Sequence, residues 1–242
     1  MVNTIGPNSD NICRDMMGGS KFLRYRISLL KLKLRLKLNN GVDYSKTCLF
    51  KDYHKNLLFI HVPKAAGISV VKSVYGVDKS NHATIFDYIA EDEIRTKTTK
   101  SFAIVRNPYD RLISAYFYLK SGGRAIIDQA WYELYISKYP TLDDFVQNGG
   151  LESAISHNAE HFIPQHRFIA ESGIFYVDHI FKLERTEDLL VFLRENGVTK
   201  LEKINTNKAP TNKQEFYLSE KSKEIINRLY KTDFDLLDYK TL

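Results

Sequence analysis

The sequence contains very little cysteine, with only Cys13 and Cys48 among its 242 residues. Two cysteines cannot build the disulfide framework of a small secreted domain, and they cannot supply the thiolates of a cysteine-based metal site. We therefore expect a reducing compartment and a fold held by its apolar core. The composition provides for such a core, because 43% of the residues are apolar and 12% are aromatic.

Long apolar runs are also missing from the sequence. No stretch reaches the roughly 18 apolar residues of a membrane-spanning helix, and the N-terminus lacks the pattern of a secretory signal. The expected location is the cytoplasm, with peripheral attachment to a membrane as a variant of it. A truncated eukaryotic chain would instead belong in the Golgi lumen.

Acidic side chains are absent from the segment Lys21 to Lys37, which carries seven basic ones. The whole chain has a net charge of only +6, so the remainder is close to neutral and a nucleic-acid partner is not expected. KLKLRLKL alternates like a strand, whereas Leu23, Ile27, Leu30 and Leu34 share one helical face. Either the leucines pack on the domain, or the segment is a basic surface that touches a membrane or a polyanion.

The rest of the chain alternates apolar runs with helical patterns. We predict a flexible tail over residues 1–20, a basic amphipathic segment over 21–50 and a single α/β domain over 51–242. Three strands are expected, in NLLFIHV, SFAIVR and FYVDHIFKLE. Helices are expected over residues 68–75, 84–94, 108–120, 125–137 and 187–195, and after capping signals at Thr141 and Ser219. Strands joined through helices predict a P-loop-like parallel sheet with helices on both faces.

The stretch PKAAGISV follows the first predicted strand directly. Gly67 permits a turn or a close approach to a ligand, and the amides that open the next helix favour an anion. Lys64 adds a positive charge, and the Ser69 hydroxyl can donate a hydrogen bond to the same anion. The motif lacks the GKS or GKT ending of a nucleotide triphosphatase loop. An ordinary turn with a solvated lysine is the alternative interpretation.

The stretch FAIVRNPYDRLISAY joins the second predicted strand to a helix. Arg106 at the strand end offers a fork of donors to a phosphate, and Ser114 in the helix can contact the same group. Arg111 could pair locally or reach the site. The two stretches together predict two anion sites at neighbouring strand ends.

These two motifs, in this order, resemble the donor-binding motifs of the family 2 sulfotransferases, which include heparan sulfate 2-O-sulfotransferase and the chondroitin 4-O-sulfotransferases. The resemblance runs from about Leu57 to Tyr239 and includes HFIPQHRFI, VDHIFKLE and YKTDFDLLDY. It implies the sulfotransferase fold and a donor, 3′-phosphoadenosine 5′-phosphosulfate (PAPS). It also implies transfer of the sulfuryl group to a carbohydrate hydroxyl. The spacing of His54, His157 and His179 does not suggest metal ligation, so no metal is expected.

The resemblance assigns the 5′-phosphosulfate of the donor to one loop and its 3′-phosphate to Arg106 and Ser114. The expected loop contacts are Pro63, Lys64, Ala65, Ala66, Gly67, Ile68 and Ser69. Lys64 would also stabilise the departing phosphate. Ile68 departs from the family pattern, which usually has a threonine there, so one hydroxyl donor is missing.

The resemblance gives His82, between the two motifs, the role of the base that deprotonates the acceptor. His161 and His166 are the competitors for the base role, and His161, Gln165 and Arg167 are the expected acceptor contacts. A surface or N-cap role for His82 and a packing corner around Pro164 are the alternatives. We expect His61 to be a satisfied core residue.

Other functions remain open at this point. The acceptor could be a small alcohol or a lipid instead of a carbohydrate. A P-loop nucleotide kinase is less favoured, because an acidic magnesium ligand after a strand is also missing. A non-catalytic homologue that only binds glycans is the last alternative.

Overall fold

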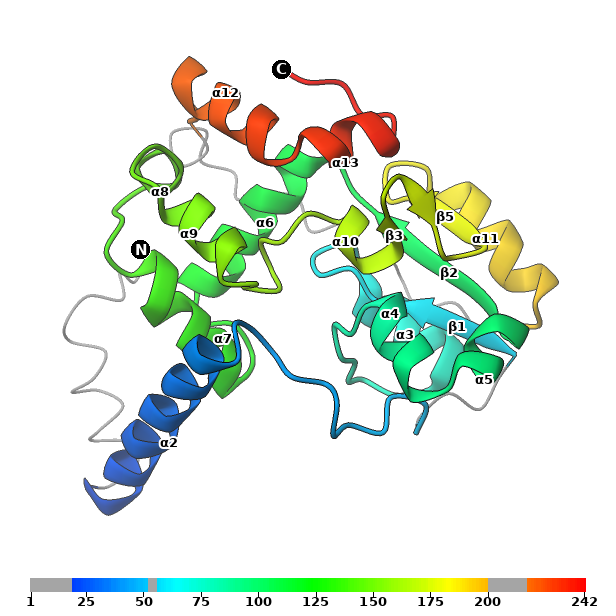
Figure 1. Ribbon diagram of the computed structural model, residues 1–242, viewed down its shortest axis with the longest axis horizontal. Helices are drawn as coiled ribbons and strands as arrows, with labels where there is room; N and C mark the ends of the chain where they lie inside the picture. The colour runs from blue at the N-terminus through cyan, green and yellow to red at the C-terminus, as the bar shows by residue number, and fades with distance from the viewer. Residues whose placement is uncertain (1–18, 52–55, 200–216) are drawn as a thin grey trace.

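The computed structural model describes residues 19–51, 56–199 and 217–242, so most of the predicted tail lies outside the described residues. Its centre is a parallel sheet of three strands in the order β1 (Leu57–Ile60), β2 (Lys100–Val105) and β5 (His179–Lys182). Every residue of β1 is buried, and so is β2 beyond Lys100. The predicted α/β class and its parallel sheet are confirmed (Figure 1).

The third predicted strand is split in the structure. Phe175 pairs with Ala170 in a separate antiparallel hairpin of β3 (Ala170–Glu171) and β4 (Ile174–Phe175), and β5 begins only at His179. The Asp178 carboxylate intervenes, since it accepts hydrogen bonds from the backbone N and the hydroxyl of Ser101 at 2.7 and 2.8 Å. The side chain of Asp178 thereby fixes the point at which the chain enters the main sheet.

The helices follow the predicted pattern with two interruptions. Asp92 divides the segment predicted as one helix over 84–94, because its side chain accepts from Arg95 N and caps a new helix. The segment predicted over 125–137 changes into a π-helix at Tyr132. The capping signals at Thr141 and Ser219 are confirmed. The helices are α2 (Gly19–Leu38), α3 (Gly67–Tyr75), α4 (Ile85–Glu91), α5 (Glu93–Thr98), α6 (Pro108–Lys120), α7 (Ile126–Trp131), η1 (Tyr132–Ile136), α8 (Leu142–Gln147), α9 (Gly150–Ser156), α10 (His166–Ile169), α11 (Thr186–Glu195), α12 (Glu220–Leu229) and α13 (Lys231–Leu236).

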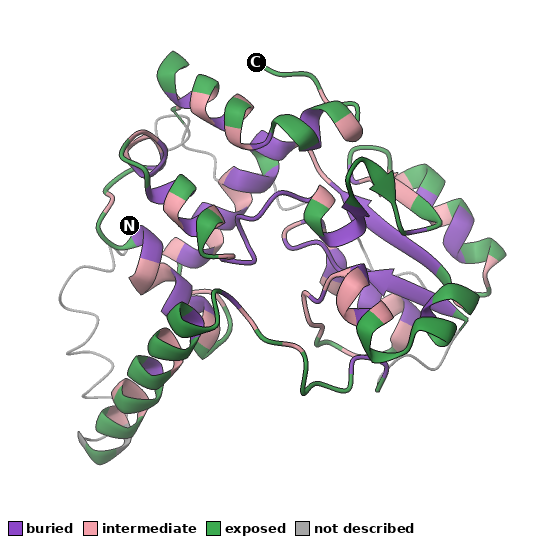
Figure 2. Ribbon diagram, in the orientation of Figure 1, coloured by how far each residue is buried: buried purple, intermediate pink, exposed green. Residues whose placement is uncertain are grey.

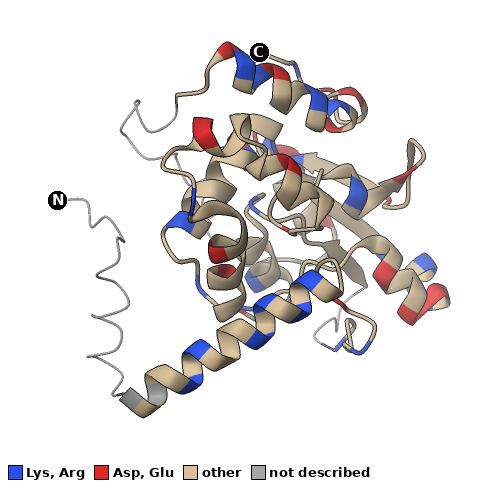
Figure 3. Ribbon diagram, turned by 60° about the vertical axis from the view of Figure 1, so that its left-hand side comes forward, with Lys and Arg blue, Asp and Glu red and all other residues tan. Residues whose placement is uncertain are grey.

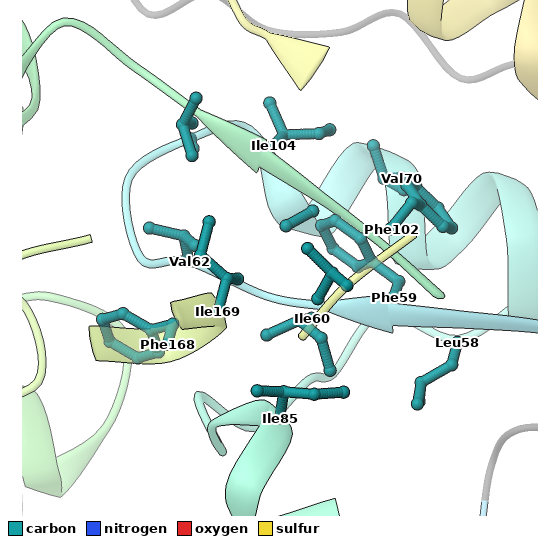
Figure 4. Close-up of a cluster of buried hydrophobic side chains, with 14 of the residues drawn as sticks. Leu58, Phe59, Ile60, Val62, Val70, Ile85, Phe102, Ile104, Phe168 and Ile169 are labelled. Carbon is teal, nitrogen blue, oxygen red and sulfur yellow. The ribbon is translucent and has the colours of Figure 1, made fainter. Parts of the chain in front are cut away.

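Two groups of apolar side chains form the interior. The first surrounds the sheet, where Phe59, Ile60 and Phe102 pack with Val70 of α3 and Ile85 of α4 (Figure 4). The second lies among the helices beside the sheet and includes side chains of α6, α7, α8, α9 and α12. Figure 2 shows that buried residues continue from the strands into these helices. The loops that follow β1 and β2 leave the sheet at the same edge, as expected for parallel strands.

Candidate active site

The loop that follows β1 has an unusual backbone. Lys64 and Ala66 both have left-handed conformations, with φ of 69° and 62°. Residues other than glycine rarely adopt such angles, and each costs about 1–3 kcal/mol and persists only where the surrounding structure enforces it. Alternation of this kind turns backbone amides toward a common concavity that suits an anion.

Arg111 holds this loop in place from α6. Its side chain is fully buried, its Nε donates to the Pro63 carbonyl at 3.1 Å, and one terminal nitrogen donates to the Ile163 carbonyl at 2.7 Å. Burial lowers the pKa of Arg111, while Tyr230 and Asp233 oppose that shift. Sequence reasoning left the role of Arg111 open, and the structure identifies it as the anchor between two loops.

Gly67 is required for space and not for its φ. A Cβ atom at this position would lie 1.9 Å from Cδ2 of His61. The His61 ring therefore packs directly against the start of α3. His61 is buried, as predicted, but its Nδ1 has no hydrogen-bond partner among the described residues, so the prediction of a satisfied core histidine is wrong.

The first turn of α3 begins without a cap from its own N-cap residue. Ala66 occupies the N-cap position, and its side chain makes no capping hydrogen bond. Ile68 and Ser69 are half-buried in that turn. The first amides of a helix lack intrahelical partners and carry the positive end of its dipole. This arrangement fits the phosphosulfate of the expected donor.

The second predicted anion site starts where β2 ends. A terminal nitrogen of Arg106 donates to the Lys64 carbonyl at 3.4 Å, which ties the two motifs together. Arg106 is half-buried, and Ser114 is half-buried on α6. Asn107 caps α6 by accepting from the amides of Tyr109 and Asp110. The structure thus brings the two predicted anion-binding motifs to adjoining positions.

The Lys64 ammonium lies over an aromatic ring. Its Nζ is 3.6 Å from the centroid of the Tyr118 ring. Burial lowers the pKa of Lys64 to about 8, with Asp128 opposing and Arg106 contributing in the same direction. A dianionic ligand would favour the protonated form, because an opposite charge stabilises it. Sequence reasoning missed Tyr118, since an aromatic residue on a buried helix usually belongs to the core.

His82 is held by a buried carboxylate. Its Nδ1 lies 3.1 Å from Oε1 of Glu160, and the other oxygen of Glu160 accepts a hydrogen bond from the Tyr44 hydroxyl at 3.1 Å. The Tyr44 hydroxyl also accepts from the backbone N of His82 at 3.1 Å. Burial alone would raise the pKa of Glu160, but His82 and His161 outweigh it and keep that pKa below its usual value. Glu160 and Tyr44 were not predicted.

His161 lies on the other side of His82. Their ring centroids are 5.4 Å apart, and the His161 ring stacks on Tyr118 at 5.5 Å. Burial lowers the pKa of His161, and its Nδ1 has no hydrogen-bond partner in the described part of the chain. Its Nε2 is 3.7 Å from the Asp128 carboxylate, which accepts a hydrogen bond from the Tyr118 hydroxyl at 2.7 Å. The site thus continues from His82 to Tyr118 and Lys64.

Three of these groups could hold a metal ion. One ligand atom each from His82, Glu160 and His161 lies within 4.8 Å of the others. A cation would have to replace the short contact between His82 and Glu160, and binding would also require both imidazoles to be neutral. The absence of a metal therefore stays a prediction.

Gln165 has its amide engaged by the protein. Its Oε1 accepts from Arg106 N at 2.9 Å, its Nε2 donates to the Arg106 carbonyl at 2.8 Å, and the residue is fully buried. This geometry favours the packing-corner alternative over the predicted acceptor contact. Arg167 is exposed on α10 and donates to the Asn158 side chain at 2.8 Å.

Comparison with known protein families supports the resemblance found in the sequence. Residues 47–240 match the model of the family described as "Sulfotransferase family". No curated protein sequence and no solved structure gives a significant match. The matched region contains the loop Pro63 to Ser69, Arg106, and the histidine cluster of His82 and His161 with Glu160. It covers more than three quarters of the chain. The chain therefore belongs to the sulfotransferase family, and it is an enzyme that takes the sulfuryl group from PAPS.

Proposed function

We propose that this sulfotransferase transfers the sulfuryl group to a hydroxyl of a carbohydrate, with His82 as the base. The observation that carries the proposal is the contact of His82 Nδ1 with Glu160 at 3.1 Å. In a neutral imidazole one nitrogen donates while the other accepts. A proton on Nδ1 that faces Glu160 leaves Nε2 able to accept the proton of an acceptor hydroxyl.

The donor-binding residues in this proposal are the loop Pro63 to Ser69, Arg106 and Ser114. The loop includes Ala65, Ala66, Gly67 and Ile68, and its contribution is mainly through backbone amides. The donor supplies an activated sulfuryl group when bound. Lys64 neutralises negative charge that grows on the phosphate side, which requires its ammonium to leave the Tyr118 ring. The missing threonine hydroxyl at Ile68 is then a minor loss.

Glu160 has two tasks in the proposed mechanism. It holds the His82 ring in one orientation, and it balances the positive charge that develops when His82 takes a proton. Tyr44 fixes Glu160 by occupying its second oxygen. His161 and Arg167 are proposed to lie on the acceptor side. His161 is less suited to be the base, because it is buried and burial lowers its pKa.

A polar groove beside Tyr44 supports a carbohydrate acceptor. Its volume is about 580 Å³, and its lining is rich in side chains that hydrogen-bond to hydroxyls. The lining residues are Asn39, Val42, Asp43, Tyr44, Ser45, Thr47, Asp87, Ala90 and Glu91. Three carboxylates in this lining favour a neutral sugar over an anionic one, because like charges repel.

Labelled-sulfate transfer from PAPS to a panel of acceptors tests this proposal. The panel contains neutral oligosaccharides, anionic polysaccharides, small alcohols and a lipid with a free hydroxyl. We expect turnover with a neutral oligosaccharide that drops at least about a hundredfold in His82→Ala. Turnover confined to small alcohols or lipids would contradict the carbohydrate assignment.

Thermal unfolding separates donor binding from acceptor choice. Adenosine 3′,5′-bisphosphate should raise the melting temperature, whereas ATP with magnesium should not. An equal response to both would favour the kinase alternative. Donor binding without transfer to any acceptor would favour a non-catalytic glycan-binding homologue.

The cytoplasm remains the proposed location, supported by the scarcity of cysteine. Among the residues that the structure describes, no helix combines the length and the apolar character needed to span a bilayer. Peripheral attachment to a membrane does not need a spanning helix, and the surface that would serve it is the basic helix α2.

A further inference from the structure

Helix α2 has two apolar faces, and only one of them is covered. Leu29 and Leu36 are buried against the helical part of the core, with Tyr25 and Leu32 packed beside them. This face lies against α7 (Figure 1), and Arg26 and Lys33 beside it form ion pairs with Glu133 of η1. The four aliphatic residues that the sequence placed on one helical face are exposed, so the expectation that they pack on the domain is wrong, and the opposite face of the helix packs there instead.

The opposite face is a continuous stripe of large aliphatic side chains in solvent. Its members are Leu23, Ile27, Leu30, Leu34 and Leu38, and they are between 45% and 76% exposed. Their spacing of three or four residues confines them to about a quarter of the helix circumference. Scattered exposed leucines are common, but a stripe along a whole helix marks an interaction surface.

Basic side chains border this stripe on both sides. Arg24, Lys31 and Arg35 follow one edge, and Arg26, Lys33 and Lys37 follow the other. Glu133 holds Arg26 and Lys33 at 3.2 and 2.8 Å. Arg24, Lys31, Arg35 and Lys37 are exposed, and none of them pairs with a carboxylate in the described part of the chain. Figure 3 shows basic residues along α2 and no acidic ones.

We propose that α2 lies in the interface of an anionic lipid bilayer, with the leucine stripe among the acyl chains and the basic borders at the headgroups. An apolar stripe between rows of cations is the pattern of a helix that lies in the membrane plane. Long basic side chains can cover the edge of the apolar region while their charges stay in the headgroup layer. Helix α2 extends away from the other described elements (Figure 1), and its leucine stripe is exposed.

The charge pattern disfavours two other occupants. A second copy of α2 would bring basic borders against basic borders, since the helix contains no acidic residue. A soluble polyanion would satisfy the cations but would leave the leucine stripe in water. An anionic bilayer satisfies both the stripe and its borders.

Co-sedimentation with vesicles tests the proposal on the full chain. We expect binding to vesicles of phosphatidylcholine with phosphatidylglycerol, and at least about tenfold weaker binding to phosphatidylcholine alone. The double variant Leu30→Ser, Leu34→Ser should weaken binding to anionic vesicles by about tenfold or more. Ile94→Ser is the matched control, because Ile94 is 78% exposed on α5, away from the stripe.

A tryptophan at the stripe distinguishes insertion from surface adsorption. The native Trp131 is buried and gives a constant background. In Leu34→Trp, the emission should shift to shorter wavelength with anionic vesicles, and brominated lipids should quench it. If the emission remains at the wavelength of a water-exposed tryptophan, the result would contradict the proposal and favour adsorption through charge alone.

Two further outcomes would overturn the proposal. One is equal vesicle binding by the double leucine variant and the unmodified protein. The other is a dimer in solution that the double leucine variant abolishes, without vesicle binding by either protein. Thermal stabilisation by adenosine 3′,5′-bisphosphate should be unchanged in the leucine variant, which verifies its fold independently of the proposed acceptor.

Discussion

The donor loop and the histidine cluster lie close together but are built by different means. The loop Pro63 to Ser69 is shaped by main-chain conformation, and Arg111 and Arg106 hold it through its carbonyl groups. The cluster depends on side-chain contacts between distant segments, above all His82 with Glu160. Substitutions in the cluster can therefore leave the donor loop intact. Substitution of a residue that holds the loop, such as Arg111, must also change the loop itself.

The largest expected effect is on turnover and comes from the cluster. His82→Ala should lower kcat by about 10²–10⁴-fold, because it removes the proposed base. The response of the melting temperature to adenosine 3′,5′-bisphosphate should stay the same. Loss of that response would show that the cluster and the donor loop are not independent of each other. Near-normal turnover would transfer the base role to His161.

A change under the loop should affect stability and donor binding together. Arg111→Met leaves the Pro63 and Ile163 carbonyls without their buried donor, which should lower the free energy of unfolding by about 3 kcal/mol. Urea denaturation measures this change. The control Arg228→Met removes an exposed pair with Glu152 and should cost no more than about 1 kcal/mol. Equal losses in both variants would contradict the anchoring role.

The carboxylate of the cluster should matter less than its histidine. Glu160→Gln keeps the shape but removes the charge, and we expect kcat to fall by about tenfold with little change in the donor KM. Tyr44→Phe should have a smaller effect in the same direction, since it removes the hydrogen bonds to one oxygen of Glu160 and to the backbone N of His82 but keeps the Glu160 charge. A donor KM that rises while kcat stays constant would show that Glu160 serves the loop instead.

The smallest effect is a dependence of donor binding on pH. The pKa of Lys64 in the free enzyme is about 8, and the ammonium form binds the anion. Affinity for adenosine 3′,5′-bisphosphate should therefore be full well below pH 8 and decline as the pH rises through it, by less than about tenfold between pH 7 and pH 9. Isothermal titration at several pH values measures the decline. Lys64→Arg should flatten the profile, because arginine stays charged.

Local signals in the sequence predicted the elements well. The first two strands, α6 and the caps at Thr141 and Ser219 follow from apolar runs, proline and capping residues. The break at Asp92 was not predicted, because the surrounding pattern suits one continuous helix. The start of β5 was missed because it depends on contacts of Asp178 with Ser101, far away in the sequence.

The sequence identified residues that carry a motif and missed those that support them. Glu160 and Asp128 have no recognisable spacing from His82 or Lys64, so only the fold brings them together. Gln165 was expected to face the acceptor, yet its contacts with Arg106 depend on how two loops meet. A buried polar side chain that hydrogen-bonds to distant backbone groups leaves no local pattern in the sequence.

The packing of His61 against Gly67 restricts how this loop can change over evolutionary time. A larger residue at position 67 would collide with the ring, and the collision involves the ring itself and not a flexible chain end. Replacement of His61 first would open a gap beneath α3, so that either order passes through an impaired intermediate. The two positions should therefore vary as a pair among relatives, and a library that varies position 67 alone should yield few functional members.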